Sequence, residues 1–124
     1  MINHKCDAFI VACIDFRFQK FIKNWLDKNF KNKTYDYVGF AGATKDLKTI
    51  MKQLDISVRL HQIKQVVLIH HEDCDAYGKE STHDRHVADL GKVKKIIKNK
   101  YPKLQVDLYY LHLDGMFEKV CGKI

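Results

Sequence analysis

Four stretches of the chain are rich in β-branched and aromatic residues, a composition typical of β-strands. They are residues 8–13 (AFIVAC), 35–40 (YDYVGF), 65–70 (QVVLIH) and 104–113 (LQVDLYYLHL). The first and third are nearly continuous apolar runs, as in strands that are covered on both faces of a sheet. The pattern therefore predicts four strands, at least two of which are buried on both sides.

Hydrophobic residues between these stretches recur every three or four positions, which is the period of an amphipathic helix. They form three stripes: Phe18, Phe21, Ile22, Trp25, Leu26 and Phe30; Leu47, Ile50, Met51, Leu54 and Val58; and Val87, Leu90, Val93 and Ile97. We interpret each stripe as the core-facing side of a helix. Asp114-Gly115 is a tight-turn pair between two alternating stretches, so it predicts a hairpin that closes the sheet.

The order of these elements predicts an α/β fold of three layers, α/β/α, around a central and mainly parallel sheet. Four strands form the parallel part, and the hairpin adds an antiparallel edge strand. Neither an internal repeat nor a Gly/Ser-rich linker interrupts the chain, so we expect residues 1–124 to form a single domain. Ligands of such open sheets bind at the carboxyl ends of the strands, where the strand order reverses.

The composition narrows the classes of function. The net charge is +7, but the lysines are scattered over the polar faces of the predicted helices, so we expect solvated surfaces and no nucleic-acid partner. The first residues lack the basic and apolar succession of a signal peptide, and no apolar run is long enough to span a bilayer. We therefore expect a cytoplasmic protein without a membrane partner, whose four cysteines serve metal binding or packing rather than disulfides.

Two chemically active motifs fall where predicted strands end. Cys13 closes the first strand and is followed by Asp15 and Arg17. The third strand runs into the sequence HHEDC, which contains His71 and Cys74. Thiolate sulfur and imidazole nitrogen suit Zn²⁺, and catalytic zinc sites commonly have three protein ligands and an open fourth position. The sequence therefore predicts a zinc site formed by Cys13, His71 and Cys74. A closed structural site, with Asp15 or another cysteine as the fourth ligand, is the alternative.

Ordinary structural roles are expected for most of the other cysteines and histidines. We expect Cys6 and Cys121 to be packed or free thiols, and His70 to be packed or hydrogen-bonded on the opposite side of its strand from the next residue. His83 and His86 could shuttle protons between the site and buffer, or they could lie on the solvated first turn of a helix. The candidate caps of that helix are Ser81, Thr82 and Asp84. The acidic residues of the metal loop, Glu72, Asp73 and Asp75, are expected to be solvated or bound to backbone amides, and Asp75 could modify the site.

The two motifs resemble the paired signature of β-class carbonic anhydrases, in which C-x-D-x-R is followed far downstream by H-x-x-C. Here they are CIDFR at 13–17 and HEDC at 71–74. The segment YVGFAGATKDL is similar to the Ala-Gly loop of that family, and VDLYYLHLDGMFEKV is similar to its closing strand pair. The resemblance covers most of the chain. It implies a zinc lyase that reversibly hydrates carbon dioxide to bicarbonate and a proton, and that forms a homodimer or a higher homo-oligomer.

Carried over residue by residue, the resemblance implies that Cys13, His71 and Cys74 hold the zinc ion. Asp15 and Arg17 are then the catalytic pair. Asp15 accepts a hydrogen bond from water or, in a closed state, takes the fourth position on zinc, while Arg17 holds this carboxylate ionised and correctly turned.

Several positions depart from the family pattern. Glycine normally follows H-x-x-C, where this chain has Asp75, and glycine is also usual at the position of His70. Gly39 and Phe40 precede the Ala-Gly pair in place of Arg-Asn. We therefore expect the metal loop and the substrate pocket to be built differently in this chain.

Two other functions stay open at this point. One is a related zinc hydrolase that acts on another small electrophile, such as carbonyl sulfide or carbon disulfide. The same metal hydroxide would attack those carbon atoms, and the fold alone does not decide the substrate. The other is a non-catalytic module that binds zinc or an anion. We favour hydration of carbon dioxide because Asp15 and Arg17 would have no task in a purely structural site.

Overall fold

The computed structural model describes residues 4–121 and, within them, a five-stranded sheet. Its strands are β1 (Ala8–Ala12), β2 (Tyr35–Gly39), β3 (Gln65–His71), β4 (Gln105–Leu111) and β5 (Phe117–Val120). Their spatial order is β2-β1-β3-β4-β5, with the first four parallel and β5 antiparallel to β4. The predicted sheet of four parallel strands and one antiparallel edge strand is confirmed.

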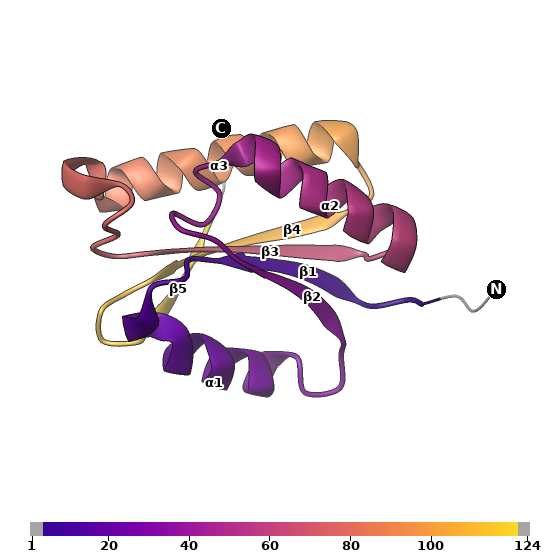
Figure 1. The fold of residues 1–124 in the computed structure, drawn as a ribbon, viewed down its shortest axis with the longest axis horizontal. Helices are drawn as coiled ribbons and strands as arrows, with labels where there is room; N and C mark the ends of the chain where they lie inside the picture. Colours follow the sequence, from indigo (N-terminus) through magenta and orange to yellow (C-terminus); the bar gives the residue numbers. More distant parts are fainter. Residues whose placement is uncertain (1–3, 122–124) are drawn as a thin grey trace.

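Helices cover both faces of this sheet. They are α1 (Gln19–Asn29), α2 (Leu47–His61) and α3 (His83–Lys100), with short 3₁₀ turns η1 (Phe16–Phe18) and η2 (Gly78–Glu80). In Figure 1, α1 lies on one side of the sheet and α2 and α3 lie together on the other. The three-layer α/β/α architecture is therefore confirmed. None of the helices within residues 4–121 is long and apolar enough to cross a membrane.

The continuous apolar sequence of β1 follows from its place between two layers of helices. Every residue of this strand is buried. Because successive side chains point to opposite faces, Ile10 belongs to a core cluster with Ile22 of α1. Val11 belongs to the cluster on the other face, with Leu54 of α2 and Leu90 of α3. This packing on both faces fixes the position of the loops that leave the carboxyl ends of the strands.

Side chains at the helix starts satisfy the first backbone amides. Asp46 accepts a hydrogen bond from the Thr49 amide at the start of α2, with an N–O distance of 3.3 Å. Thr82 accepts from the Arg85 amide at the start of α3, at 3.1 Å. Thr82 is therefore the cap among the three candidates in the sequence.

The hairpin between β4 and β5 has the expected tight turn. The Gly115 amide donates to the carbonyl of His112 at 2.9 Å, and Gly115 has φ +93°, a conformation that L-residues rarely adopt. A Cβ at Gly115 would lie 2.6 Å from the Phe21 ring. The strand β4 ends at Leu111 rather than at residue 113, because His112 already belongs to the turn.

The strand order indicates at which edge of the sheet a ligand would bind. β1 lies between β2 and β3, so the chain passes to opposite sides of β1 as it forms these two neighbours. The carboxyl ends of β1 and β3 therefore lie side by side where the strand order reverses, the usual place for a ligand in an open α/β sheet. Both sequence motifs follow these two strand ends.

Candidate metal centre

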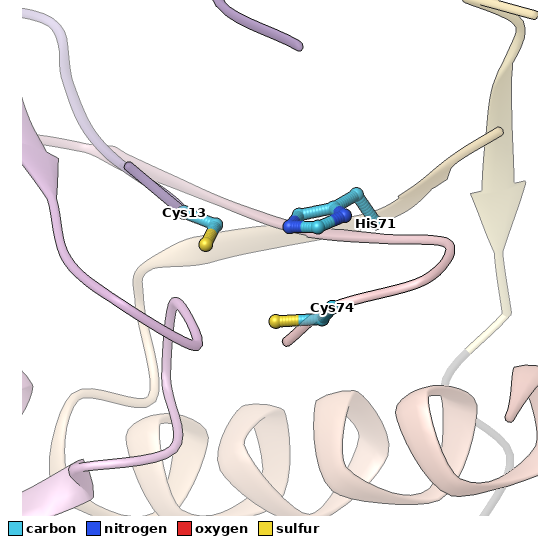
Figure 2. Close-up of side chains that lie close together, drawn as sticks. All are labelled: Cys13, His71 and Cys74. Carbon is cyan, nitrogen blue, oxygen red and sulfur yellow. The ribbon is translucent and has the colours of Figure 1, made fainter. Parts of the chain in front are cut away.

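Three side chains with zinc-binding atoms converge at this edge of the sheet. Cys13 follows β1, His71 is the last residue of β3, and Cys74 lies in the loop after β3. All three are buried, and their ligand atoms lie within 4.8 Å of one another. Figure 2 shows both sulfur atoms and the imidazole ring turned toward a common space. The structure thus brings together the three residues that the two motifs predict as metal ligands.

His71 has one ring nitrogen engaged and the other unpaired. Its Nδ1 lies 2.7 Å from the backbone oxygen of Glu72, and since that oxygen can only accept, Nδ1 carries the proton. Nε2 is buried and has no hydrogen-bond partner. The ring packs on Phe18, with 4.1 Å between ring centroids, so it cannot turn freely. An unpaired buried nitrogen is costly, and a cation held beside the two thiols would satisfy it.

The two thiols differ in acidity because they interact with each other. The contact with Cys74 lowers the pKa of Cys13 despite burial, and His71 and the Gly42 amide contribute in the same direction. The Gly42 nitrogen lies 3.4 Å from Cys13 Sγ. The contact with Cys13, together with burial, raises the pKa of Cys74. Two thiol sulfurs and one imidazole nitrogen form a donor set that fits Zn²⁺.

Gly42 lets the loop after β2 approach the loop that carries Cys74. Its φ is +78°, and a Cβ there would lie 3.2 Å from the Cβ of Ala76 and 3.0 Å from that of Lys45. The Lys45 ammonium donates to the backbone oxygen of Ala76 at 2.7 Å, which ties the two loops together. The Ala-Gly segment therefore has a structural reason for its glycine beside the candidate metal ligands.

Asp15 and Arg17 form a two-pronged ion pair at the border of this centre. Arg17 Nη2 lies 2.7 Å from Asp15 Oδ2, and Nε lies 3.1 Å from Oδ1. These bonds hold the pKa of Asp15 below its usual value, so the carboxylate is ionised. Asp15 Oδ2 is 3.9 Å from the unpaired Nε2 of His71. An ionised acceptor therefore lies next to the candidate metal position.

Arg17 also holds the loop that carries Cys74. Its Nη1 donates to Asp73 Oδ2 at 3.0 Å, and its Nη2 donates to the Asp73 backbone oxygen at 2.8 Å. Asp73 is solvated, as expected, with 62% of its side chain exposed, and it also pairs with Arg17, a contact that the sequence did not predict. Glu72 does bind a backbone amide, that of Leu113, at 2.8 Å. Because Arg17 and Asp73 are 56 positions apart, local sequence carries no signal of their contact.

The positive φ expected of a glycine after H-x-x-C lies elsewhere in this loop. Asp73, one residue before Cys74, has φ +56°, whereas Asp75 is not among the residues with positive φ. Aspartate tolerates this conformation better than most residues. The left-handed residue of this loop therefore precedes Cys74, and the turn over residues 75–77 that follows Cys74 is made without a positive φ at Asp75.

A small cleft opens beside the centre. Its volume is about 350 Å³, and Cys13, Asp15 and Arg17 line it together with Asp75. Phe16, also on its border, has 86% of its surface exposed. A larger hollow of about 580 Å³ lies at the opposite ends of the strands and is lined by none of the candidate ligands. The smaller cleft thus reaches one of the candidate ligands, Cys13, and both residues of the ion pair beside it.

His70 and His86 are buried together behind the centre. His70 Nε2 lies 2.6 Å from Thr44 Oγ1, and its Nδ1 lies 2.9 Å from His86 Nδ1, so the expectation of a hydrogen-bonded His70 is confirmed. The expectation that His86 lies on a solvated first turn was wrong, since 1% of its surface is exposed. Its spacing carried the signal, because His86 precedes Leu90 by four positions on the apolar stripe of α3. Burial lowers the pKa of His70 to about 3 and that of His86 to about 4.

Cys6 and Cys121 lie apart from this centre, as predicted, and all four cysteines are free thiols. Cys6 shares a second group of potential ligand atoms with Asp36 and His61. Asp36 Oδ2 already accepts from Ser57 at 2.6 Å and pairs with His61 at 2.7 Å, which ties β2 to α2. These bonds account for the group without an ion.

Curated relatives of the chain come from two Rickettsia species. An uncharacterized protein of Rickettsia bellii is 29% identical over 136 residues, which cover 94% of this chain and 83% of that protein. An uncharacterized protein of Rickettsia conorii is also 29% identical over 136 residues, covering 94% of this chain and 73% of the relative. Their names carry no activity.

Solved structures with the same fold are carbonic anhydrases. The carbonic anhydrase of Streptococcus mutans has a TM-score of 0.69 and 17% identity, over 96% of this chain and 84% of that chain. A β-carbonic anhydrase of Trichomonas vaginalis has a TM-score of 0.66 and 14% identity, over 99% and 87%. The β-carbonic anhydrase of Aspergillus fumigatus gives 0.63 and 14%, over 98% and 78%. At identities this low, the structural similarity establishes a shared fold.

The family comparison covers nearly the whole chain. Residues 3–121 match the family described as "Putative carbonic anhydrase". Both sequence motifs, the Ala-Gly loop and the closing hairpin lie inside the matched range. The chain therefore belongs to this carbonic anhydrase family, as a divergent member with the β-carbonic anhydrase fold.

Proposed function

We propose that this protein catalyses the reversible hydration of carbon dioxide to bicarbonate and a proton, with Zn²⁺ held by Cys13, His71 and Cys74. The observation that carries the proposal is the position of the ionised Asp15–Arg17 pair directly beside three converging ligand atoms. A closed structural site would have no use for this pair.

The ligand set would give zinc a defined charge and an open position. Two thiolates offset the charge of the ion, and His71 binds as a neutral imidazole through its free Nε2. When bound, Zn²⁺ supplies the Lewis acidity that makes hydroxide available from water near neutral pH. All three side chains are buried, and the cleft lined by Cys13 lies beside them.

Asp15 has the task of orienting the attacking water. Because its pKa is lowered, it acts as an acceptor and holds a water proton away from the substrate, so that an oxygen lone pair faces carbon dioxide. Arg17 fixes both carboxylate oxygens and keeps the charge on Asp15. In a closed state, the same carboxylate would take the fourth position on zinc.

Exposed apolar residues beside the cleft support a homodimer. Ile14 and Phe16 line the cleft and are 59% and 86% exposed. Isolated exposed residues need no explanation, but two beside the candidate centre form a surface that a second copy of the chain would cover. Residues of that copy would then complete an apolar pocket for carbon dioxide.

The predicted cytoplasmic location stays a prediction from the sequence.

Stopped-flow measurement of carbon dioxide hydration by zinc-loaded protein tests the proposal. We expect Asp15→Asn to lower the rate by about 100-fold or more while zinc stays bound. Cys74→Ser should lose both zinc and activity. The exposed Cys121 lies outside the centre, so Cys121→Ser is the matched control and should keep both.

The outcome also separates the alternatives. A zinc-loaded protein that hydrolyses carbonyl sulfide or carbon disulfide but forms no bicarbonate from carbon dioxide would be the related hydrolase. A protein that binds zinc and turns over none of these substrates would be a binding module. Either result contradicts the proposed hydratase.

A further inference from the structure

Cys74 lies in a loop without regular secondary structure, between β3 and η2. The position of its sulfur therefore depends on what holds the loop from outside. Arg17 holds Asp73 on one side. On the other side, the Cys74 amide donates to Ser81 Oγ, at an N–O distance of 2.8 Å. This second contact acts on the backbone of the ligand residue itself.

Ser81 is the outer end of a chain of hydrogen bonds that runs into the core. Ser81 Oγ lies 2.9 Å from His86 Nε2, and His86 Nδ1 lies 2.9 Å from His70 Nδ1. His70 Nε2 in turn lies 2.6 Å from Thr44 Oγ1. The chain thus connects the Cys74 backbone to α3, to β3 and to the loop after β2.

All the hydrogen bonds from Ser81 to Thr44 can be made with the protons donated inward or outward along the series. A neutral imidazole has one donor and one acceptor nitrogen, and the Nδ1–Nδ1 contact holds one proton. If Ser81 donates to His86, then His86 donates to His70 and His70 donates to Thr44. In the reverse direction, every one of these bonds is also made. Both arrangements leave Ser81 Oγ a lone pair for the Cys74 amide.

The histidines have no room to leave these positions. One per cent of the surface of each is exposed. The His86 ring packs against Tyr77, with 4.3 Å between centroids, and against Tyr110 at 5.7 Å. Tyr77 is itself fixed by its hydroxyl, which donates to Asp89 at 2.6 Å. A buried and fully paired polar network of this kind is rigid.

We propose that Ser81 and His86 are positioning residues for the metal ligand Cys74, with His70 and Thr44 anchoring the inner end of the chain. The proposal rests on the zinc site of the proposed function, but it concerns ligand geometry rather than the reaction. Zinc needs sulfur at about 2.3 Å and nitrogen at about 2.0 Å, so a loop free to drift would bind it weakly. The chain of hydrogen bonds transmits the rigidity of the core to a ligand that lies in a loop, three positions beyond the end of β3.

Zinc affinity of two neighbouring variants tests this inference. Ser81→Ala removes the acceptor of the Cys74 amide. Thr82→Ala removes the cap of α3 next to it but makes no contact with the Cys74 amide. We expect Ser81→Ala to weaken zinc binding, measured by competition with a chelator, by about 10- to 100-fold. Thr82→Ala should lower Tm and leave the zinc affinity within about threefold of wild type. A merely structural role of Ser81 would lower the Tm of Ser81→Ala and leave its zinc affinity within about threefold of wild type.

Two variants of His86 test the inner part of the chain. The amide of glutamine reaches the place of Nε2 and can restore the bond to Ser81, whereas that of asparagine reaches the place of Nδ1 and can bind only His70. We expect His86→Gln to bind zinc more tightly than His86→Asn. The Co²⁺-substituted proteins should show the thiolate-to-metal absorption of Cys74 weakened or shifted in Ser81→Ala and in His86→Asn.

The inference is overturned if Ser81→Ala binds zinc as wild type does, if Thr82→Ala weakens zinc as much as Ser81→Ala, or if His86→Asn and His86→Gln bind alike. None of these readings uses carbon dioxide. Absence of hydration by a zinc-loaded wild type would therefore contradict the proposed function alone, whereas absence of zinc binding by wild type would overturn both.

Discussion

Replacing Gly42 by alanine should destabilise the fold and loosen the candidate metal centre together. Gly42 has φ +78°, and a Cβ there would lie 3.0 Å from Lys45 Cβ and 3.2 Å from Ala76 Cβ. Its amide donates toward Cys13 Sγ at 3.4 Å. Relief of the crowding moves Ala76, which lies in the loop of Cys74, or moves the amide away from Cys13. Either movement changes the distance between the two thiols.

The size of the effect follows from three contributions. A left-handed backbone conformation costs an L-residue about 1–2 kcal/mol. Alanine reduces the entropy of the unfolded chain, which offsets about 0.4–1 kcal/mol. Two contacts closer than ordinary van der Waals distance add a cost of about 1 kcal/mol. We therefore expect Gly42→Ala to lower the free energy of unfolding by about 1–2.5 kcal/mol.

Gly39, the last residue of β2, provides the matched control three positions before Gly42. It has no positive φ, and a Cβ there would meet its nearest atoms at 3.5 and 3.6 Å, ordinary contact distances. Gly39→Ala should change the free energy of unfolding by less than about 0.5 kcal/mol. Urea unfolding and chelator competition for zinc measure both effects. Equal stability and equal zinc affinity of Gly42→Ala and Gly39→Ala would refute the reasoning.

Three other properties should follow from the structure. Zinc at 100 times its Kd should raise the free energy of unfolding by about 2.7 kcal/mol in wild type and in Cys121→Ser, but not in Cys74→Ser, as thermal melts with and without zinc will show. Burial lowers the pKa of His86 from 6.5 to about 4, so the unfolded chain binds more protons between these values. Stability is then complete above about pH 6.5 and falls by on the order of 3 kcal/mol as the pH drops toward 4; urea unfolding of His86→Phe should lack this part of the decline. Phe16→Asp should convert a dimer into a monomer without loss of Tm in sedimentation and melting experiments, and a variant that stays dimeric would place the interface elsewhere.

The sequence predicts those parts of the molecule in which local pattern decides the outcome. The apolar run of β1 reports burial on both faces, and the Asp114-Gly115 pair reports a tight turn. Cys13 and His71 could be placed at one edge of the sheet because parallel neighbours end on the same side. A single domain over residues 1–124 stays a prediction.

The sequence does not predict contacts that tertiary packing creates. Arg17 and Asp73 meet because β1 and β3 are neighbours, and the sequence around either residue does not indicate the contact. Ser81 looks like a helix cap, yet its hydroxyl accepts from the Cys74 amide, and the cap is Thr82. His86 shares the apolar stripe of α3, but the residue that satisfies its buried Nδ1, His70, lies on β3.

The rate of carbon dioxide hydration at increasing zinc content tests the proposed centre most directly. Metal-free protein would receive Zn²⁺ in steps, with bound zinc and the stopped-flow rate measured on the same samples. We expect the rate to rise in proportion to zinc until one ion is bound per chain and then to stay constant, and we expect Cys74→Ser to show no such rise. One zinc bound per chain without hydration between about pH 7 and 9 would contradict the account.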